Sequence, residues 1–263
     1  MQIMAVYPGR FHPFHRGHAG SFKELVKRFG IENTLLAISG KQEQPKSPFS
    51  AAERARMATA LGIPPENIIK ISQPYRAEEY IQYLRDKGVD PQEIALVFGV
   101  SKKDMEGVPE LGIPPDPRFE FKPKRDGSPS YLQPFTDEDS VKNIMTHAYV
   151  ISTNVGEFPI AGETMRDASA IRKAYIHGNQ QKRKRILHDL YGDAAEKIKP
   201  IFDANLQNIV SEDTQRLVEF LERMRPLLPQ ATPQQRRRLL QMIAQHRPGV
   251  SQQSHNPDYV DER

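Results

Sequence analysis

The stretch Gly-Arg-Phe-His-Pro-Phe-His-Arg-Gly-His, residues 9–18, decides the fold class that we expect for this chain. It follows an apolar run, residues 2–7, that stops at Pro8 as a buried strand stops at a loop. It leads into residues 17–29, whose apolar side chains recur at helical spacing before Gly30. This strand, loop and helix are typical of the first unit of an open α/β sheet, and such loops are where these sheets bind ligands.

Further apolar runs extend this pattern along the chain. Strands are predicted over residues 34–39, 67–71, 93–98 and 147–152, and helices from about Ser50, where Glu53 completes a capping box, and over residues 77–87. Strands that alternate with helices at this spacing predict an α/β fold, a Rossmann-like open parallel sheet with flanking helices. Residues 100–135 contain seven prolines and are predicted to be an irregular insertion, neither sheet nor helix.

The carboxyl-terminal part of the chain is predicted to be helical. Helices are expected over residues 168–177, 180–191, 194–208, 211–228 and 232–246, and residues 247–263 have almost no apolar side chains. We therefore expect a main domain at residues 1–205 that includes the insertion, a helical extension at 206–247 and a disordered tail at 248–263. The extension has narrow apolar stripes, which predict packing on a protein partner or a homo-oligomer.

Composition excludes several kinds of chemistry. The 263 residues include no cysteine, so disulfides, thiolate metal sites and cysteine nucleophiles are excluded. No apolar run approaches the roughly 20 residues that span a bilayer, and no signal peptide is evident. We expect a soluble, cytoplasmic protein without a membrane partner. Residues 172–199 hold eight basic against three acidic residues, but without interleaved aromatics they favour a solvated helix face over a nucleic-acid surface.

Three histidines lie within seven residues, at His12, His15 and His18. Backbone N–H groups and the dipole of a helix that starts here favour a bound phosphate, and Gly17 allows the backbone to approach it closely. His15 and His18 are three residues apart and could both donate N–H bonds to oxygens that gain charge as phosphorus is attacked. Zinc would need three or four converging ligands, and no cysteine or obvious carboxylate is nearby. The Gly-Lys-Ser/Thr ending of a P-loop is also absent.

Residues 9–18 resemble the first signature of the HxGH nucleotidyltransferase superfamily, whose fold is cytidylyltransferase-like, and within it the archaeal-type nicotinamide mononucleotide adenylyltransferases. Residues 46–54, Lys-Ser-Pro-Phe-Ser-Ala-Ala-Glu-Arg, resemble the segment Arg-x-Pro-Phe-Thr-Ala-Gly-Glu-Arg of that family. Residues 169–172, Ser-Ala-Ile-Arg, match the end of the late signature of the superfamily. The resemblance covers about residues 1–200, and the whole chain also looks similar to nucleotidyltransferases of tailed bacteriophages.

The resemblance implies a role for each matching residue. His15, His18 and Arg172 would be catalytic, and Gly9, Arg10, Phe11, Gly17, Lys46, Asp104 and Ser169 would bind nucleotide. Lys46 stands where the family has arginine and lacks its bidentate geometry. Asp104 belongs to residues 98–104, a loose match to the family's Gly-x-x-Asp loop, and the neighbouring Lys102 and Lys103 fit solvated lysines equally well. Phe14 and Phe49 fit the pocket and the core equally well.

Asp167 departs from the family pattern, because an acidic residue beside a triphosphate is unexpected. It could cap the helix that follows or help hold Mg²⁺. The resemblance implies in-line transfer of a nucleotidyl group, with Mg²⁺ on the nucleoside triphosphate and release of pyrophosphate. AMP from ATP and nicotinamide mononucleotide are the expected donor and acceptor. The alternatives are a cytidylyltransferase that uses CTP, an RNA-binding protein, and a catalytically weak structural or interaction protein such as a virion-associated one. If the protein is encoded by a phage, it is expected in the cytoplasm of the bacterial host.

Overall fold

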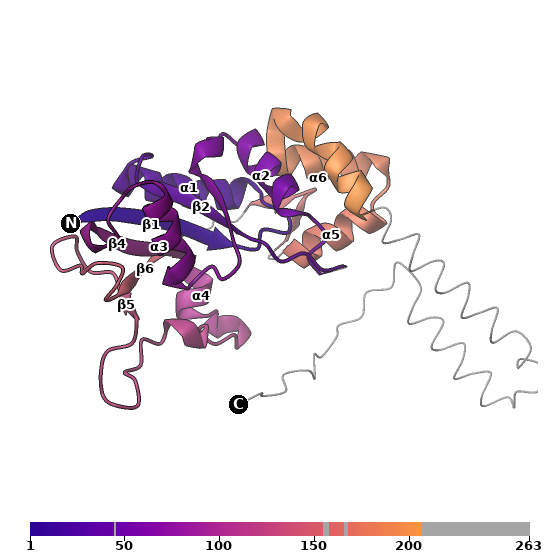
Figure 1. Cartoon of the computed structure of the whole chain (residues 1–263). Helices are drawn as coiled ribbons and strands as arrows, with labels where there is room; N and C mark the ends of the chain where they lie inside the picture. Colours follow the sequence, from indigo (N-terminus) through magenta and orange to yellow (C-terminus); the bar gives the residue numbers. More distant parts are fainter. Residues whose placement is uncertain (45, 155–157, 166–167, 207–263) are drawn as a thin grey trace, which may run out of the picture.

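The computed structural model describes residues 1–44, 46–154, 158–165 and 168–206, and Figure 1 shows how their helices and strands are arranged. One parallel sheet has the strand order β3-β2-β1-β4-β6-β5. Its strands are β1 (Gln2–Gly9), β2 (Thr34–Ser39), β3 (Ile68–Ile71), β4 (Ile94–Ser101), β5 (Leu132–Pro134) and β6 (Ala148–Thr153). A separate antiparallel hairpin consists of β7 (Pro159–Ile160) and β8 (Glu163–Thr164).

Apart from α4, the helices lie where the periodicity predicts them. They are α1 (Arg16–Phe29), α2 (Ala51–Ala60), α3 (Ala77–Asp86), α4 (Lys102–Glu106), α5 (Ala168–His177) and α6 (Gln180–Tyr191), and residues 195–206 are also helical. The predicted capping box is confirmed, because the backbone N–H of Glu53 donates to Ser50 Oγ at 3.2 Å and Glu53 Oε2 accepts from the backbone N–H of Ser50 at 2.7 Å. The Rossmann-like open parallel sheet with flanking helices is confirmed as well.

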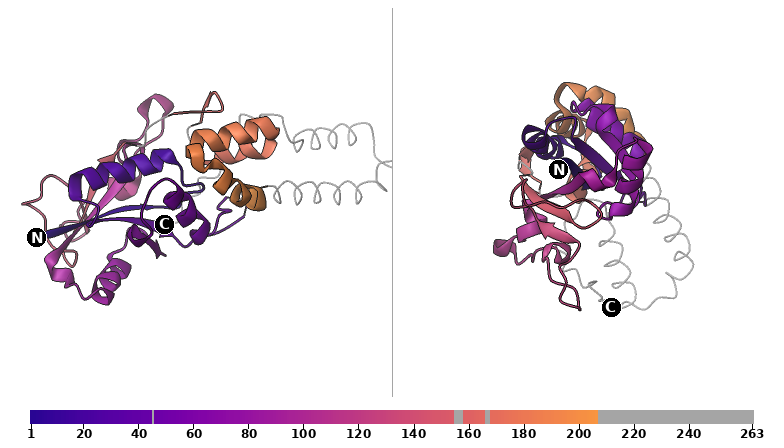
Figure 2. Two further views of the ribbon diagram at one scale, coloured as in Figure 1. Left: turned by 90° about the horizontal axis from the view of Figure 1, so that it is seen from above. Right: turned by 60° about the vertical axis from the view of Figure 1, so that its left-hand side comes forward.

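Alternate side chains of the sheet face two apolar layers. Ala5 and Tyr7 of β1 belong to a cluster with residues of α1, α2, α5 and α6, whereas Met4 and Val6 belong to a cluster with residues of α3. Figure 2 shows α1 and α3 on opposite sides of the sheet. Because both faces are covered, the central strands β1, β2 and β4 are buried along nearly their whole length, as is usual for a parallel sheet.

The insertion contains more regular structure than its prolines predict. The prediction of neither sheet nor helix is wrong for Lys102–Glu106, which forms α4, and for Leu132–Pro134, which forms the edge strand β5. Ser101 caps α4 by accepting the backbone N–H of Asp104 at 3.1 Å, which stabilises a short helix before the first proline. Pro134 fits an edge strand, where a missing N–H leaves no central ladder bond unmade.

Several predictions fall outside the described residues. These are the helical extension and disordered tail, the partner surface expected on that extension, and the role of Asp167. Within the described ranges, no helix combines the length and the apolar character needed to cross a membrane.

Candidate active site

A cleft of about 710 Å³ opens at the carboxyl ends of β1, β2 and β4. Strand order reverses between β1 and β4, which is where open parallel sheets place their ligands. The cleft has three kinds of wall: the loop after β1 with the ends of β2 and β4, the segment from α4 to Arg118, and the apolar side chains of Phe158, Ile160, Met165, Ala168 and Ile171.

His15 and His18 together cap the amino terminus of α1. His15 Nδ1 accepts the backbone N–H of Gly17 at 3.1 Å, and His18 Nδ1 accepts the backbone N–H of His15 at 3.3 Å. The two rings are tilted by 30° to each other with their centroids 3.8 Å apart, and both line the cleft. Since Nδ1 of each ring is an acceptor, the remaining proton of each neutral ring is on Nε2. The capping box therefore fixes two N–H donors side by side at a helix amino terminus.

The three histidines of residues 9–18 stay uncharged at neutral pH. Burial, and next to it Arg54 and Arg172, lowers the pKa of His12 to about 3. Burial, with a smaller contribution from Arg16, lowers the pKa of His15 to about 4. Burial and then His15 hold the pKa of His18 well below its usual value. His15 and His18 thus suit donation of hydrogen bonds to phosphate oxygens rather than general acid catalysis at neutral pH.

These lowered pKa values predict a pH dependence of stability. The unfolded histidines have a pKa of about 6.5, so between about pH 6.5 and pH 4 the unfolded chain binds more protons than the folded one. The free energy of unfolding is expected to be highest above about pH 6.5 and to decrease as the pH falls from there to about pH 4. Urea unfolding of the wild type and of His15→Asn, measured from about pH 7 to pH 4, checks this. Equal pH dependence in both proteins would contradict it.

Three side chains from later helices hold the loop after β1. Arg54 of α2 donates through Nη1 to the carbonyl of Arg10, and Arg172 of α5 donates through Nη1 to the carbonyl of His12. Tyr191 of α6 donates its hydroxyl to the carbonyl of Phe14 at 2.6 Å. Alternate carbonyls of the loop are thereby satisfied from three helices, which fixes the backbone that presents the histidines.

Arg54 also connects this loop to the one after β2. Its side chain is fully buried, and Nη2 donates to the carbonyl of Lys41 at 3.3 Å while Nε donates to that of Ser50 at 3.2 Å. Burial lowers the pKa of Arg54 to about 10, so the guanidinium stays charged at neutral pH. The buried Arg54 side chain therefore holds together the loops after β1 and β2, which both line the cleft.

Gly9 is needed because the ring of Phe11 lies against its backbone. A Cβ at Gly9 would come within 2.5 Å of Phe11 Cε1 and Cζ, and Phe11 itself has a φ of 52°, in the left-handed region. His12 and Pro13 are joined by a cis peptide bond. The turn after β1 thus depends on a residue without a side chain.

Gly9→Ala is expected to lower the free energy of unfolding by about 1–3 kcal/mol, because the new methyl group must displace the buried Phe11 ring. Gly20→Ala is the matched control. Gly20 lies in α1 with no atom within 4 Å of its added Cβ, so alanine there is expected to raise stability by about 0.5–1 kcal/mol. Urea unfolding of the two variants checks both signs, and a loss of stability in both would contradict the role of Phe11.

The family described as cytidylyltransferase-like matches residues 6–107. This segment contains β1 to α4, and therefore the histidine capping box, Arg54 and Asp104.

The relatives match over short segments. Nicotinamide-nucleotide adenylyltransferase 1 of Sulfolobus acidocaldarius is 44% identical over 57 residues, which are 21% of this chain and 31% of the relative. A probable nicotinate-nucleotide adenylyltransferase of Roseobacter denitrificans is 32% identical over 69 residues, 26% of this chain and 35% of the relative. The chain spans about a third of the length of these relatives. A bifunctional NMN adenylyltransferase/ADP ribose pyrophosphatase of Francisella tularensis has a TM-score of 0.43 at 14% identity, covering 83% of this chain and 57% of that chain.

The segment that matches the family model brings most of the expected site residues into the cleft. Gly9, Arg10, Phe11, His15, His18, Lys103 and Asp104 line it. Gly17 is buried, and its backbone N–H donates to His15 Nδ1. Lys46 and Lys102 are exposed and are not among the lining residues. Lys102 pairs with Glu106 at 3.6 Å. Phe14 and Phe49 are fully buried in the core.

Of the late signature, residues 169–172, Ile171 lines the cleft, whereas Ser169 and Arg172 are not among its lining residues. Ala168 and Ile171 of α5 line the cleft, whereas Arg172 donates to the His12 carbonyl and, at 3.1 Å, to Ser169 Oγ. The structure thus gives Arg172 a positioning contact, and phosphate binding by Arg172 and Ser169 stays a prediction.

The polar lining residues that the sequence analysis missed include Lys41, Tyr75, Asp116 and Arg118. Lys41 follows the predicted strand at residues 34–39, so its position at a strand end was a usable signal. Asp116 and Arg118 lie in the proline-rich insertion, where no periodicity or motif singles them out. Tertiary contacts alone bring them to the cleft.

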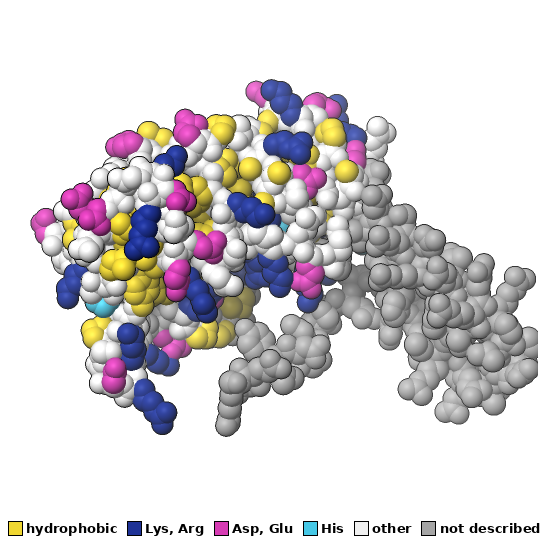
Figure 3. Space-filling model, in the orientation of Figure 1, with side chains coloured by type: hydrophobic (Ala, Val, Ile, Leu, Met, Phe, Trp, Pro, Cys, Tyr) yellow, Lys and Arg dark blue, Asp and Glu magenta, His cyan; other side chains and the backbone are white. Residues whose placement is uncertain are grey.

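The basic run of residues 182–185 has structural partners. Lys182 pairs with Glu163 at 2.7 Å, and Arg183 donates to the carbonyls of Tyr175 and Ile176 at the end of α5, each at 2.9 Å. On the visible face in Figure 3, Lys and Arg side chains at the end formed by α5 and α6 are interspersed with acidic ones. Within this basic run, Arg183 therefore joins α6 to the carboxyl end of α5.

Proposed function

We propose that this protein is a nucleotidylyltransferase that transfers AMP from ATP to a phosphorylated acceptor, nicotinamide mononucleotide, and releases pyrophosphate. The observation that carries the proposal is the pair of neutral histidines at the amino terminus of α1, whose Nδ1 atoms are both acceptors within the capping box. Their Nε2–H groups would donate to a ligand at the end of the cleft that Arg10 and Lys41 line.

In the proposed reaction, an acceptor phosphate oxygen forms a bond to the α-phosphorus of ATP, and the bond from that phosphorus to the bridging oxygen breaks. Pyrophosphate leaves with the electron pair, so no covalent enzyme intermediate is needed. His15 and His18 would donate to non-bridging oxygens as these gain charge, and Arg10 and Lys41 would balance the phosphates. Catalysis would then come from positioning and from charge stabilisation.

Further phosphate contacts are proposed for Ser169 and Arg172, which lie at the start of α5 beside the cleft wall. Lys46 is proposed as a contact for the outer phosphates, since its exposed side chain belongs to the loop that precedes α2. The donor would in this arrangement occupy the α5 side of the cleft and the acceptor the α4 side.

Mg²⁺ is proposed to arrive on the triphosphate. The residues that the structure describes contain no group of three histidine or acidic side chains that could hold a metal, and in the cleft Asp116 is engaged by Arg118. Mg²⁺ often keeps its waters and binds substrate phosphates with few protein ligands, so the residues fit a nucleotide-borne ion. The ion would supply charge neutralisation on the phosphates. Because the proposed donor is cellular ATP, we propose the cytoplasm as the site of the reaction.

Incubation of the protein with Mg²⁺, each of ATP and CTP, and each of nicotinamide mononucleotide and nicotinate mononucleotide tests the proposal. Pyrophosphate and a dinucleotide are expected with ATP. Product with CTP alone would replace the proposed donor, and no pyrophosphate with any pair would overturn the proposal.

A further inference from the structure

The insertion builds the end of the cleft that lies on the side of α4. The backbone N–H of Asp116 donates to the carbonyl of Asp104 at 2.8 Å, which docks the insertion on α4. The Arg118 guanidinium lies over the ring of Tyr75, 4.7 Å from its centroid, and Tyr75 packs edge-on against Phe98 of β4 at 5.5 Å. Arg118 is therefore held in one place by packing against the sheet.

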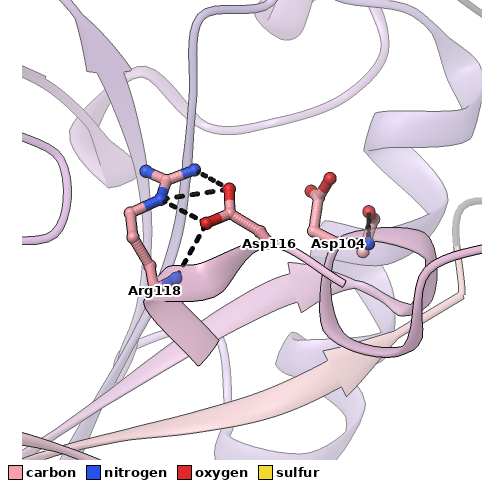
Figure 4. A network of polar contacts seen from close by, with 4 residues as sticks. Asp104, Asp116 and Arg118 are labelled. Atoms are coloured by element: carbon pink, nitrogen blue, oxygen red, sulfur yellow. Dashed lines mark hydrogen bonds and ion pairs between the residues drawn. The ribbon is translucent and has the colours of Figure 1, made fainter. Parts of the chain in front are cut away.

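Asp116 engages two nitrogens of the Arg118 guanidinium. Arg118 Nε donates to Oδ1 at 3.0 Å and to Oδ2 at 3.1 Å, and Nη2 donates to Oδ2 at 2.5 Å. Arg118, chiefly through its hydrogen bonds, holds the pKa of Asp116 below its ordinary value, so the carboxylate is charged at neutral pH. Figure 4 shows the Asp116 carboxylate between the guanidinium and Asp104. The positive charge of Arg118 is thus matched before any ligand binds.

The charged groups at this end of the cleft balance each other. Lys103 and Arg118 are the lining cations, and Asp104 and Asp116 are the lining carboxylates. At the histidine end, Arg10 and Lys41 are the lining cations, and the described residues place no carboxylate in the lining there, although Lys41 pairs with Glu43 at 3.2 Å just outside it. A phosphate is therefore favoured at one end, whereas an additional carboxylate at the other end would approach Asp104 and an already paired guanidinium.

Resting on the proposed function, we propose that the Asp116–Arg118 pair determines acceptor specificity. It selects a mononucleotide whose ring carries a neutral amide over one whose ring carries a carboxylate. The two acceptors differ in one charged group, and Asp116 has already neutralised the guanidinium that would bind that group. An amide keeps its hydrogen bonds to polar groups of either sign and meets no repulsion.

The test compares nicotinamide and nicotinate mononucleotide on the full chain, by steady-state kinetics with ATP and by calorimetric binding of each mononucleotide alone. Asp116→Asn removes the charge that matches Arg118 and keeps an oxygen acceptor. We expect it to reduce the preference for the amide about tenfold, mainly by tightening binding of the acid. Arg118→Gln leaves Asp116 unmatched and is expected to weaken binding of the acid further. Glu120→Gln is the matched control, because Glu120 pairs with Lys122 in the same insertion without lining the cleft.

The two kinds of readout separate this inference from the proposed function. If pyrophosphate forms but Asp116→Asn leaves both the kinetic and the binding preference unchanged, the specificity role is overturned and the reaction stands. If no pyrophosphate forms but the ratio of binding constants shifts as expected, the reaction fails and the role of the pair stands. A wild type that prefers the acid, an equal shift in Glu120→Gln, or no binding of either mononucleotide would overturn the inference.

Discussion

His18→Ala is expected to lower kcat/KM for the proposed adenylyl transfer by about a hundredfold to a thousandfold, the usual loss when one donor to a developing charge is removed. The effect should fall mainly on kcat, because the N–H bond strengthens as the phosphate oxygens gain charge. His18 also accepts the backbone N–H of His15, so a stability loss of about 1 kcal/mol is expected as well. Pyrophosphate release by the folded variant, with folding checked by circular dichroism, gives the measurement.

His188→Ala is the matched control for this experiment. His188 is an exposed histidine of α6, with 72% of its side chain accessible, and is not a lining residue of the cleft. It should retain wild-type kinetics. His18→Asn keeps a polar N–H donor and should recover part of the loss. Wild-type kcat in His18→Ala would remove the histidine pair from the proposed mechanism.

Arg54→Met is expected to lower the free energy of unfolding by about 3 kcal/mol, because the carbonyls of Arg10 and Lys41 both lose a buried charged donor. The loops after β1 and β2 should then move independently. KM for both substrates should rise even where the variant remains folded. Urea unfolding measures the first effect and steady-state kinetics the second.

Arg56→Met is the matched control, because Arg56 lies on the same helix with its side chain exposed. This substitution should change the free energy of unfolding by less than about 0.5 kcal/mol. Arg54→Lys keeps the charge but cannot form the fork of guanidinium bonds, so it should fall between the wild type and Arg54→Met. Equal stability of Arg54→Met and Arg56→Met would show that Arg54 does not hold the two loops together.

Local patterns were sufficient for most of the fold. The range Thr34–Ser39 was predicted without error because a short, continuous apolar run between polar loops is typical of a buried strand. The capping box at Ser50 and Glu53 was predicted because it depends on residues three apart. Ala168–His177 and Gln180–Tyr191 were also predicted correctly. The insertion was not, since β5 exists only through its pairing with β6.

The candidate site divides in the same way. The sequence by itself determined the strand, loop and helix that present His15 and His18, because the capping contacts join residues within three positions of each other. Only the tertiary structure decided that Arg54, Arg172 and Tyr191 donate to that loop and that Asp116 and Arg118 close the other end of the cleft. Arg54 and Arg10 are 44 positions apart, Tyr191 and Phe14 are 177 apart, and no local periodicity encodes such a hydrogen bond. Local chemistry thus determined which groups face a phosphate, and long-range packing determined what surrounds them.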